Sequence, residues 1–518
     1  MGQYNGVEIA AFGLLDAQIH SAFGVYGYPA NEAGECLSHR FDHFHWSVNE
    51  KVSFELALGV SAAGYRAGVI IKQAGMNILY DPLVNAVVHG IGGGLVILSM
   101  DDIGCTKSTV EQDSRQLAQV AGVPVFDPSS AREVRDTIPY AFTLSETCSV
   151  PVLVRISSRL RSSSMTCREE GSVKKPLQTE HRVNKKIASH LSKIGRMQYY
   201  TEKKLPHIRS YMEAFYGEPT MDELTEGNVG VITCGGCCEL LQELALPYQS
   251  LTASWPLPEK KILSFLKRYE NILVIEEPNN FLENQLCALV HRYAIGTRIL
   301  GRNHGMLPSN GFHSVERIRL VVEGLQQQEV ILPHQREPAI RGKKPPETYP
   351  PLVHIYQELS QVTKEKDVRV AVDVGSSMSL MHPPYDIAEW GYCLGSPISV
   401  ATGLARCGER AMAVIGDYAF IHSGIQSLME AVDQQQDVMV IIIHDGISRR
   451  TGGQPHLLRA RETNLTPSSM ELFIRACGVT HVEIDSVTAK TPLATIREKM
   501  ITLLKKKGVA VTVFTLFE

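Results

Sequence analysis

Short runs of apolar, β-branched residues alternate with helical patterns of apolar residues along most of the chain. This alternation predicts parallel strands joined by helices, which is an α/β fold with doubly wound, mostly parallel sheets. In a first region, residues 1–158, the amphipathic helices are expected at 114–121 and 132–145. Strands are expected there at 67–71, 94–98 and 150–154.

Two further regions repeat the alternation. The second, residues 228–325, has strand patterns at 230–233 and 271–276. The third, residues 352–518, has strand patterns at 368–372, 411–415, 438–443 and 509–514. The stretch 326–351 between them is rich in Pro, Gln and Lys, which is typical of an interdomain linker. We therefore predict three α/β domains.

The segment 159–227 joins the first two domains and begins with an excess of positive charge. Between residues 159 and 209 there are 13 Lys or Arg against four Glu. A nucleic-acid patch and a solvated connector both fit this charge. Aromatic residues are sparse within it and the whole chain has a net charge of −4, so the connector is favoured and nucleic acid is not an expected partner.

The overall composition, 44% hydrophobic and 20% charged, is that of a globular protein with several cores. The 11 cysteines are scattered, which argues against a disulfide scaffold. No run approaches the ~18 uncharged apolar residues that a membrane-spanning helix needs, and no signal peptide pattern opens the chain. We expect a cytoplasmic protein without membrane contact.

Two aspartates follow predicted strands of the third domain. Asp417 comes directly after 411–415 and Gly416, and Asp445 follows the strand that ends near His444. Ligands of open α/β sheets lie at the carboxyl ends of strands, and carboxylate and carbonyl oxygens suit Mg²⁺. Asp417 and Asp445 with the Ile447 carbonyl therefore predict a Mg²⁺ site that holds a diphosphate, although Asp after a strand also serves as a turn former.

Glu50 opens a helical stretch of small residues, where an acidic side chain either favours the helix N-terminus or takes part in catalysis. His422, His444 and His456 cluster around the aspartate pair in sequence. His422 and His456 are the candidate proton donors, although any one of the three also suits a structural hydrogen bond. The glycines from His89 to Gly94 precede a strand, so they do not fit a dinucleotide-binding loop. Cys234, Cys237 and Cys238 lack a second cysteine pair at metal-binding spacing.

Several of these segments together resemble the large subunit of indolepyruvate:ferredoxin oxidoreductase and related thiamine-diphosphate enzymes. The resemblance covers nearly the whole chain. It is densest in the blocks Trp46-Ser-Val-Asn-Glu-Lys-Val52, Val110-Glu-Gln-Asp-Ser-Arg115 through Ser145-Glu146, and Gly416-Asp417 through His456. It implies an aminopyrimidine-binding domain (1–158), a transketolase C-terminal-like middle domain (228–325) and a diphosphate-binding domain (352–518), with thiamine diphosphate and Mg²⁺ as cofactors.

The resemblance also implies roles for single residues. Glu50 matches the glutamate that hydrogen-bonds the aminopyrimidine ring and activates the cofactor. Gly416 and Asp417, with Asp445 and the Ile447 carbonyl, match the segment that binds the metal and diphosphate. Leu394 is the candidate for the apolar side chain that holds the cofactor bent.

Departures from the family concern the substrate and the electron acceptor. Asn31 stands where relatives carry Thr, Asp445 stands where they carry Asn, and Lys107 adds a cation before Arg115. Ser448-Arg-Arg450 stands where the relatives carry Thr-Ala-Met, and Arg449 and Arg450 there are expected to offset the charge of Asp445 or to meet an acidic substrate. The candidate substrate residues are therefore Asn31, Lys107, Arg115, Arg449 and Arg450.

The relatives end in a ferredoxin-like segment with closely spaced cysteines, whereas here only Cys477 lies beyond Cys407. We therefore expect no iron–sulfur cluster, and a non-oxidative decarboxylase of a 2-oxo acid such as an aryl- or indolepyruvate, with acyloin formation as a neighbouring activity. A first alternative is an oxidoreductase subunit that passes electrons to a separate iron–sulfur partner. A second is an inactive paralogue that serves as a binding subunit. A homodimer is expected by analogy.

Overall fold

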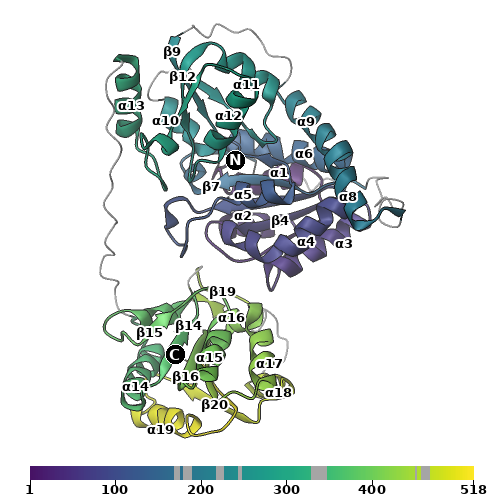
Figure 1. The fold of residues 1–518 in the computed structure, drawn as a ribbon. Helices are drawn as coiled ribbons and strands as arrows, with labels where there is room; N and C mark the ends of the chain where they lie inside the picture. Colours follow the sequence, from purple (N-terminus) through teal and green to yellow (C-terminus); the bar gives the residue numbers. More distant parts are fainter. Residues whose placement is uncertain are drawn as a thin grey trace. The chain divides into compact units, whose positions relative to one another are not determined.

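The computed structural model describes residues 1–168, 175–178, 190–216, 227–242, 248–327, 347–449, 452–456 and 467–517. They form two compact units, Met1–Pro338 and Ala339–Glu518 (Figure 1). Within the described residues, no helix is long and apolar enough to cross a membrane.

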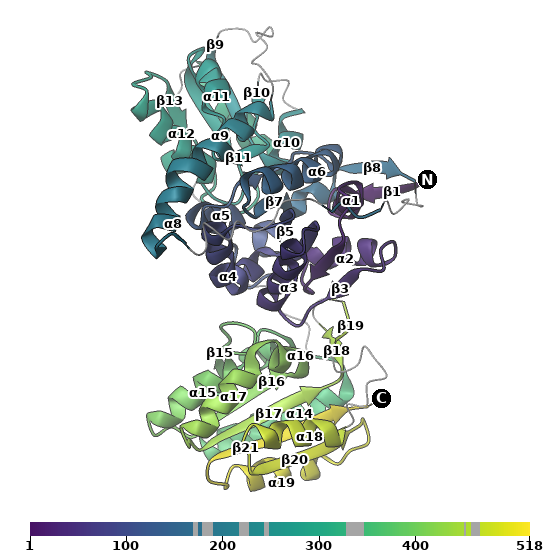
Figure 2. The same cartoon turned by 90° about the vertical axis from the view of Figure 1, so that its right-hand side faces the viewer.

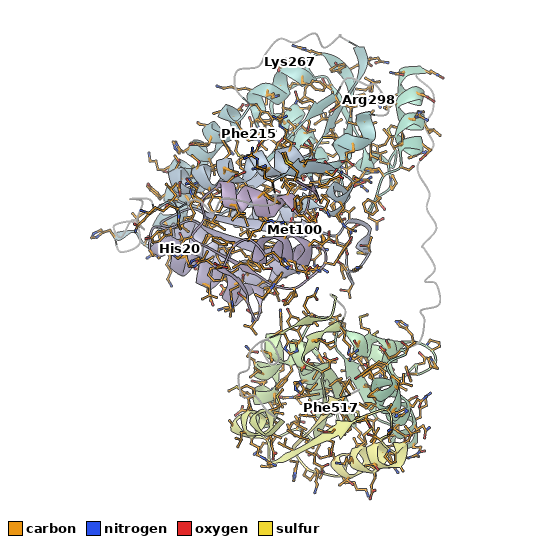
Figure 3. The ribbon with its side chains drawn as sticks, turned by 180° about the vertical axis from the view of Figure 1, so that it is seen from behind. His20, Met100, Phe215, Lys267, Arg298 and Phe517 are labelled. Atoms are coloured by element: carbon orange, nitrogen blue, oxygen red, sulfur yellow. The ribbon has the colours of Figure 1, made fainter. Side chains whose placement is uncertain are left out.

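A seven-stranded sheet in the order β11-β6-β7-β5-β4-β2-β3 forms the centre of the first unit. All neighbours are parallel except β11 (Ala253–Trp255), which runs antiparallel to β6. Every residue of β5 is buried, as in a sheet covered on both faces; Met100, labelled in Figure 3, belongs to this strand. The parallel strands are β2 (Ser21–Gly24), β3 (Phe44–Trp46), β4 (Ala67–Lys72), β5 (Leu95–Asp101), β6 (Val125–Phe126) and β7 (Val152–Ser157).

Helices cover both faces of this sheet (Figure 2). On one face α3 packs against α4, and α4 against α5; on the other, α1 packs against α2 and α6. Asn49 caps the start of α3 by accepting a hydrogen bond from the Val52 amide at 2.9 Å. The bounds are α1 (Ile9–Asp16), α2 (Ala30–Ser38), α3 (Glu50–Ala62), α4 (Met76–His89), α5 (Ser114–Ala121) and α6 (Ala131–Cys148).

A second, four-stranded parallel sheet in the order β10-β9-β12-β13 belongs to the same unit. Two apolar clusters, one against each face of the sheet, make it doubly wound. Its strands are β9 (Gly227–Thr233), β10 (Tyr248–Ser250), β12 (Tyr269–Ile275) and β13 (Arg298–Leu300). Its helices are α10 (Cys238–Gln242), α11 (Glu259–Leu266), α12 (Phe281–Arg292) and α13 (Val315–Gln327).

The second unit is built on a six-stranded parallel sheet in the order β15-β14-β16-β17-β21-β20. Alternate residues of β14 and β16 face opposite cores, so that Val370 and Val372 pack with α14 and α19, and Ala371 packs with α15, α17 and α18. The strands are β14 (Arg369–Val372), β15 (Ala388–Trp390), β16 (Ala411–Gly416), β17 (Val438–His444), β20 (His481–Val487) and β21 (Val509–Leu516). The helices are α14 (Pro350–Lys366), α15 (Pro397–Arg406), α17 (Ile425–Asp433), α18 (Pro467–Ala476) and α19 (Leu493–Leu503).

The six parallel strands of the first sheet and those of the third sheet share one topology. Numbered along the chain, both read 2-1-3-4-6-5 across the sheet. In such a sheet, strand 2 is added on one side of strand 1 and strand 3 on the other. The connections on the two sides leave a crevice at the carboxyl ends of strands 1 and 3, and this switch point is the expected ligand position. These switch points lie between β2 and β4 in the first unit and between β14 and β16 in the second.

The predicted α/β fold with three mostly parallel sheets is confirmed, and each of the nine predicted strands overlaps an observed one. The helix 114–121 has the predicted bounds, and 132–145 lies inside α6. The short strands β2, β3, β6, β10, β11, β13 and β15 were not predicted.

The boundaries of the three domains stay a prediction. β11, from the predicted middle domain, completes the first sheet.

A buried network of arginines and carboxylates joins the first two sheets. Asp127 Oδ2 lies 3.2 Å from Arg115 Nη1 and 2.9 Å from Arg155 Nη1. Arg115 also pairs with Asp113 at 2.6 Å and with Glu276, which follows β12, at 3.0 Å. The side chains of Arg115 and Asp127 are fully buried. Arg115 is also a predicted substrate residue, and in the structure its guanidinium pairs with these three carboxylates.

Replacing Asp127 with Asn should destabilise the protein by about 3 kcal/mol or more, because two buried guanidinium groups lose a shared counter-charge. Urea unfolding of the full chain measures the change. The matched control is Asp136→Asn, at an exposed pair with Arg132 on α6, where a change of at most about 0.5 kcal/mol is expected. Equal stability of the two variants would contradict the structural role of Asp127.

Candidate functional site

Acidic side chains gather at the carboxyl ends of three neighbouring strands in the second unit. Asp373 directly follows β14, Asp417 follows β16, and His444 and Asp445 lie at the end of β17. Since β14 and β16 flank the switch point of this sheet, the site lies where open α/β sheets bind ligands.

Both carboxylate oxygens of Asp417 contact polar groups of the neighbouring segment 444–456. Its Oδ2 accepts a hydrogen bond from the Gly446 amide at 2.8 Å and lies 2.7 Å from His444 Nδ1; its Oδ1 lies 3.1 Å from His456 Nε2. Burial opposes ionisation of Asp417, but the hydrogen bonds to His444 and His456 outweigh it and lower its pKa. Asp417 is therefore an ionised carboxylate at neutral pH.

Asp445 lies beside it and carries a second carboxylate. Its pKa is raised by burial and by the charge of Asp417, while Arg449 lowers it through an ion pair. The guanidinium of Arg449 also lies 4.2 Å from the ring centroid of Tyr349. Arg449 was predicted either to offset the charge of Asp445 or to meet an acidic substrate. Its ion pair with Asp445 fits the first of these roles. Arg450 lies outside the described residues.

Two adjacent carboxylates whose mutual repulsion raises the pKa of one of them have the chemistry of a cation site. Among the described residues, no set of three His, Cys, Asp or Glu side chains is arranged around a common point for a metal. A cation here would therefore take side-chain oxygens from Asp417 and Asp445 and further ligands from backbone carbonyls, diphosphate or water.

Asp373 was not singled out in the sequence, although it follows a buried strand in the same way as Asp417. Its Oδ1 accepts a hydrogen bond from the Gly395 amide at 3.0 Å, and burial raises its pKa to about 7. Gly395 has φ +84°, and a Cβ there would lie 2.4 Å from Ser423 Oγ, so this turn requires glycine. Asp373 thus fixes the turn that follows Leu394, whose carbonyl accepts from Ser423 Oγ at 2.7 Å.

The two predicted proton donors are both buried. His422 is 2% exposed and its Nδ1 lies 3.0 Å from Ser423 Oγ. His456 is 5% exposed and contacts Asp417. Leu394 is partly buried against the apolar core beneath α15 and α17.

In the first unit, Glu50 is the first residue of α3 and its side chain is almost completely buried. It packs against Gly75, where a Cβ would lie only 2.6 Å from Glu50 Cγ and 2.7 Å from Glu50 Oε1. A larger residue at 75 would thus displace the carboxyl group.

Beside Glu50, the end of β4 carries a second set of polar groups. Lys72 Nζ donates to Ser108 Oγ at 2.8 Å, and Ser108 Oγ donates to Asp102 Oδ2 at 2.6 Å. The charge of Glu50 acts on Lys72. Lys72 and Gly75 were not predicted as site residues; the signal for Lys72 is a cation at the end of an otherwise apolar strand.

Two of the predicted substrate residues lie near the start of α2. Asn31 is the second residue of that helix, and Lys107 Nζ lies 4.6 Å from the ring centroid of Tyr28. Arg161 shares that ring, donating to the Tyr28 hydroxyl at 2.8 Å and pairing with Glu32 at 3.1 Å.

Comparisons with known proteins show what the chain is similar to. Residues 373–514 match the family described as "Thiamine pyrophosphate enzyme, C-terminal TPP binding domain". Over 533 residues the chain is 28% identical to "Indolepyruvate oxidoreductase subunit IorA" of Methanothermobacter marburgensis, covering 98% of this chain and 85% of the relative. The protein of that name from Archaeoglobus fulgidus is 29% identical over 517 residues, with coverages of 92% and 81%. The chain resembles the IorA subunit.

The IorA likeness confirms the predicted resemblance and corrects the predicted reaction. The relatives carry the name of an oxidoreductase subunit, so the expectation of a non-oxidative decarboxylase, a lyase, is wrong. Among solved structures, "2-oxoglutarate:ferredoxin oxidoreductase from Magnetococcus marinus with 2-oxoglutarate, coenzyme A and succinyl-CoA bound" has a TM-score of 0.50 at 16% identity. It covers 63% of this chain, which spans 65% of that chain, and it supports the fold.

Asp373→Asn should change how stability depends on pH. Because burial raises the pKa of Asp373 from 3.8 unfolded to about 7 folded, the stability it contributes is full below about pH 4 and is lost as the pH rises through 7. Asn keeps an oxygen acceptor for the Gly395 amide but does not titrate. From pH 5 to 7, wild type should therefore lose about 2 kcal/mol relative to the variant in denaturant unfolding. Parallel pH profiles would contradict the assignment.

Proposed function

We propose that this chain is the thiamine-diphosphate-dependent subunit of an oxidoreductase that acts on a 2-oxo acid, with an aryl- or indolepyruvate as the substrate class. The observation that carries the proposal is the likeness over 98% of the chain to a relative named as a subunit of indolepyruvate oxidoreductase. The match of residues 373–514 to a thiamine pyrophosphate-binding domain supports the cofactor.

The described residues fit this cofactor in both units. When bound, thiamine diphosphate supplies the electron sink that cleavage of a 2-oxo acid requires. Glu50, a buried carboxyl group kept in place by the small Gly75, would hydrogen-bond the aminopyrimidine ring. Leu394 would support the bent cofactor, its turn being fixed by the contact between Asp373 and Gly395.

At the diphosphate end, Asp417 and Asp445 would hold Mg²⁺, together with the Ile447 carbonyl and the backbone at Gly416. His444 and His456 would orient the Asp417 carboxylate through the hydrogen bonds they make to its two oxygens. A divalent cation would relieve the repulsion between the two carboxylates, which together with burial raises the pKa of Asp445. His422 and His456 stay predicted carriers of a proton.

Oxidation of a 2-oxo acid releases two electrons, which need an acceptor. Because the relatives are named as subunits, we propose that an iron–sulfur partner chain takes up the electrons. The homodimer and the cytoplasmic location stay predictions.

Glu50→Gln should leave the affinity for thiamine diphosphate within about threefold of wild type and lower turnover by at least about 100-fold, the usual size of an acid–base contribution. Carbon dioxide release from phenylpyruvate with a viologen dye measures turnover, and calorimetry measures cofactor binding. Glu55→Gln, on an exposed residue of the same helix that pairs with Lys51, is the control and should keep full activity. Turnover of the Glu50→Gln variant within twofold of wild type would refute the role of Glu50.

Turnover should depend on an electron acceptor. The chain, purified with the subunits that copurify from its own organism, is incubated anaerobically with phenylpyruvate or indolepyruvate, thiamine diphosphate and Mg²⁺. We expect product only after a viologen dye is added, with about two reduced dye molecules for each carbon dioxide, because each viologen takes up one electron. Aldehyde or acyloin formed without dye would overturn the oxidoreductase assignment.

A further inference from the structure

Lys72 is the last residue of β4, at the switch point between β2 and β4 of the first sheet. Its aliphatic stem lies against Gly27, where a Cβ would come within 3.0 Å of Lys72 Cδ. The absence of a side chain at Gly27, just beyond β2, therefore lets the lysine lie across the crevice in which open α/β sheets bind ligands.

The ammonium group of Lys72 is incompletely paired. It can donate three hydrogen bonds, and within the described part of the chain one goes to Ser108 Oγ at 2.8 Å while the other two have no partner. Ser108 is a neutral acceptor that also receives Gln73 Nε2 at 3.2 Å and donates to Asp102. Over the same residues, Lys72 forms no ion pair.

Asp102, whose charge acts on Lys72, does not form an ion pair with it. The two oxygens of Asp102 accept from the Thr106 amide at 3.1 Å, the Thr106 hydroxyl, the Lys107 amide at 2.9 Å and the Ser108 hydroxyl. Four hydrogen bonds occupy the acceptor positions of this carboxylate. Burial lowers the pKa of Lys72, and the charges of Asp102, Cys105 and Glu50 only partly oppose this. A bound anion would stabilise the charged ammonium.

Other cations near this end of the sheet are already engaged. Arg115 is enclosed by Asp113, Asp127 and Glu276, and Arg161 pairs with Glu32. Lys107 lies over the Tyr28 ring and is exposed. Lys72, by contrast, is partly buried and lies close enough to Glu50 to be affected by its charge. Two of its three N–H groups are available to a ligand.

We propose that Lys72 is a substrate-binding residue whose ammonium group binds the carboxylate of the 2-oxo acid. This inference rests on the proposed function and names the residue that selects an acid over its uncharged analogues. Ser108 and Gln73 position the ammonium through the hydrogen bonds described above. Glu50, the first residue of α3, keeps the cofactor role proposed above.

The test compares phenylpyruvate with its methyl ester, which keeps the ring and the 2-oxo group but lacks the charge. The full chain is loaded with a thiamine diphosphate analogue that cannot react, and calorimetry gives a dissociation constant for each compound. Wild type should bind the acid at least tenfold more tightly than the ester. Lys72→Met should raise the dissociation constant of the acid at least tenfold and change that of the ester by less than twofold.

Two further variants separate charge from structure. Lys72→Arg keeps a cation and should retain most of the preference for the acid even if Lys72→Met is poorly folded. Lys51→Met removes an exposed lysine of α3 that pairs with Glu55, and should behave as wild type. Equal effects of Lys72→Met on acid and ester, an unchanged affinity for the acid, or loss of the preference in Lys72→Arg would overturn the proposal.

Cofactor binding is measured separately with thiamine diphosphate itself. A wild-type chain that binds thiamine diphosphate but does not prefer the acid over the ester overturns the role of Lys72 and leaves the cofactor assignment standing. A wild-type chain that does not bind thiamine diphosphate contradicts the proposed function, and the role of Lys72 falls with it.

Discussion

The first unit depends on the pairing of two buried arginines with carboxylates from two different sheets. Arg115 and Arg155 cannot lose their charge, so folding must supply each with counter-charges in fixed positions. Asp127, between β6 and α6, serves both guanidinium groups. Glu276 and the Glu277 carbonyl, which follow β12, bring the second sheet into the same network. The two sheets are therefore parts of one compact body.

The same network occupies the switch point of the second sheet. In the order β10-β9-β12-β13 this point lies between β9 and β12, where a ligand would be expected. There Gly235 has φ +60°, and a Cβ on it would lie 2.5 Å from Asp127 Oδ1. Carboxylates and guanidinium groups fill the space that a ligand would need. The second sheet thus supports the first structurally, and its cysteines Cys234 and Cys237 are buried beside the network.

Sequence predicts well those features that repeat over many residues or follow a long strand. The strands β4, β5, β16, β17 and β21 are apolar runs of six to eight residues, while β6 has two residues and too few positions to show a pattern. Asp417 and Asp445 were predicted because each follows such a run. The pairing of Arg115 with Asp127 and Glu276 was not predicted, because these two carboxylates come from other elements of the fold. Glu50 was predicted from the family block, but the packing on Gly75 that fixes its carboxyl group needs the structure.

The reaction type was mispredicted for a related reason. Glu50 would activate the cofactor, and Asp417 and Asp445 would hold it, in an oxidative and in a non-oxidative enzyme alike, because both begin with the same cleavage of a 2-oxo acid. The two reactions differ in where the electrons go afterwards, and an acceptor can be carried by another chain. The candidate site residues therefore indicate only the cleavage of the 2-oxo acid, which both reactions share. The later step is indicated only by the likeness of the whole chain to oxidoreductase subunits.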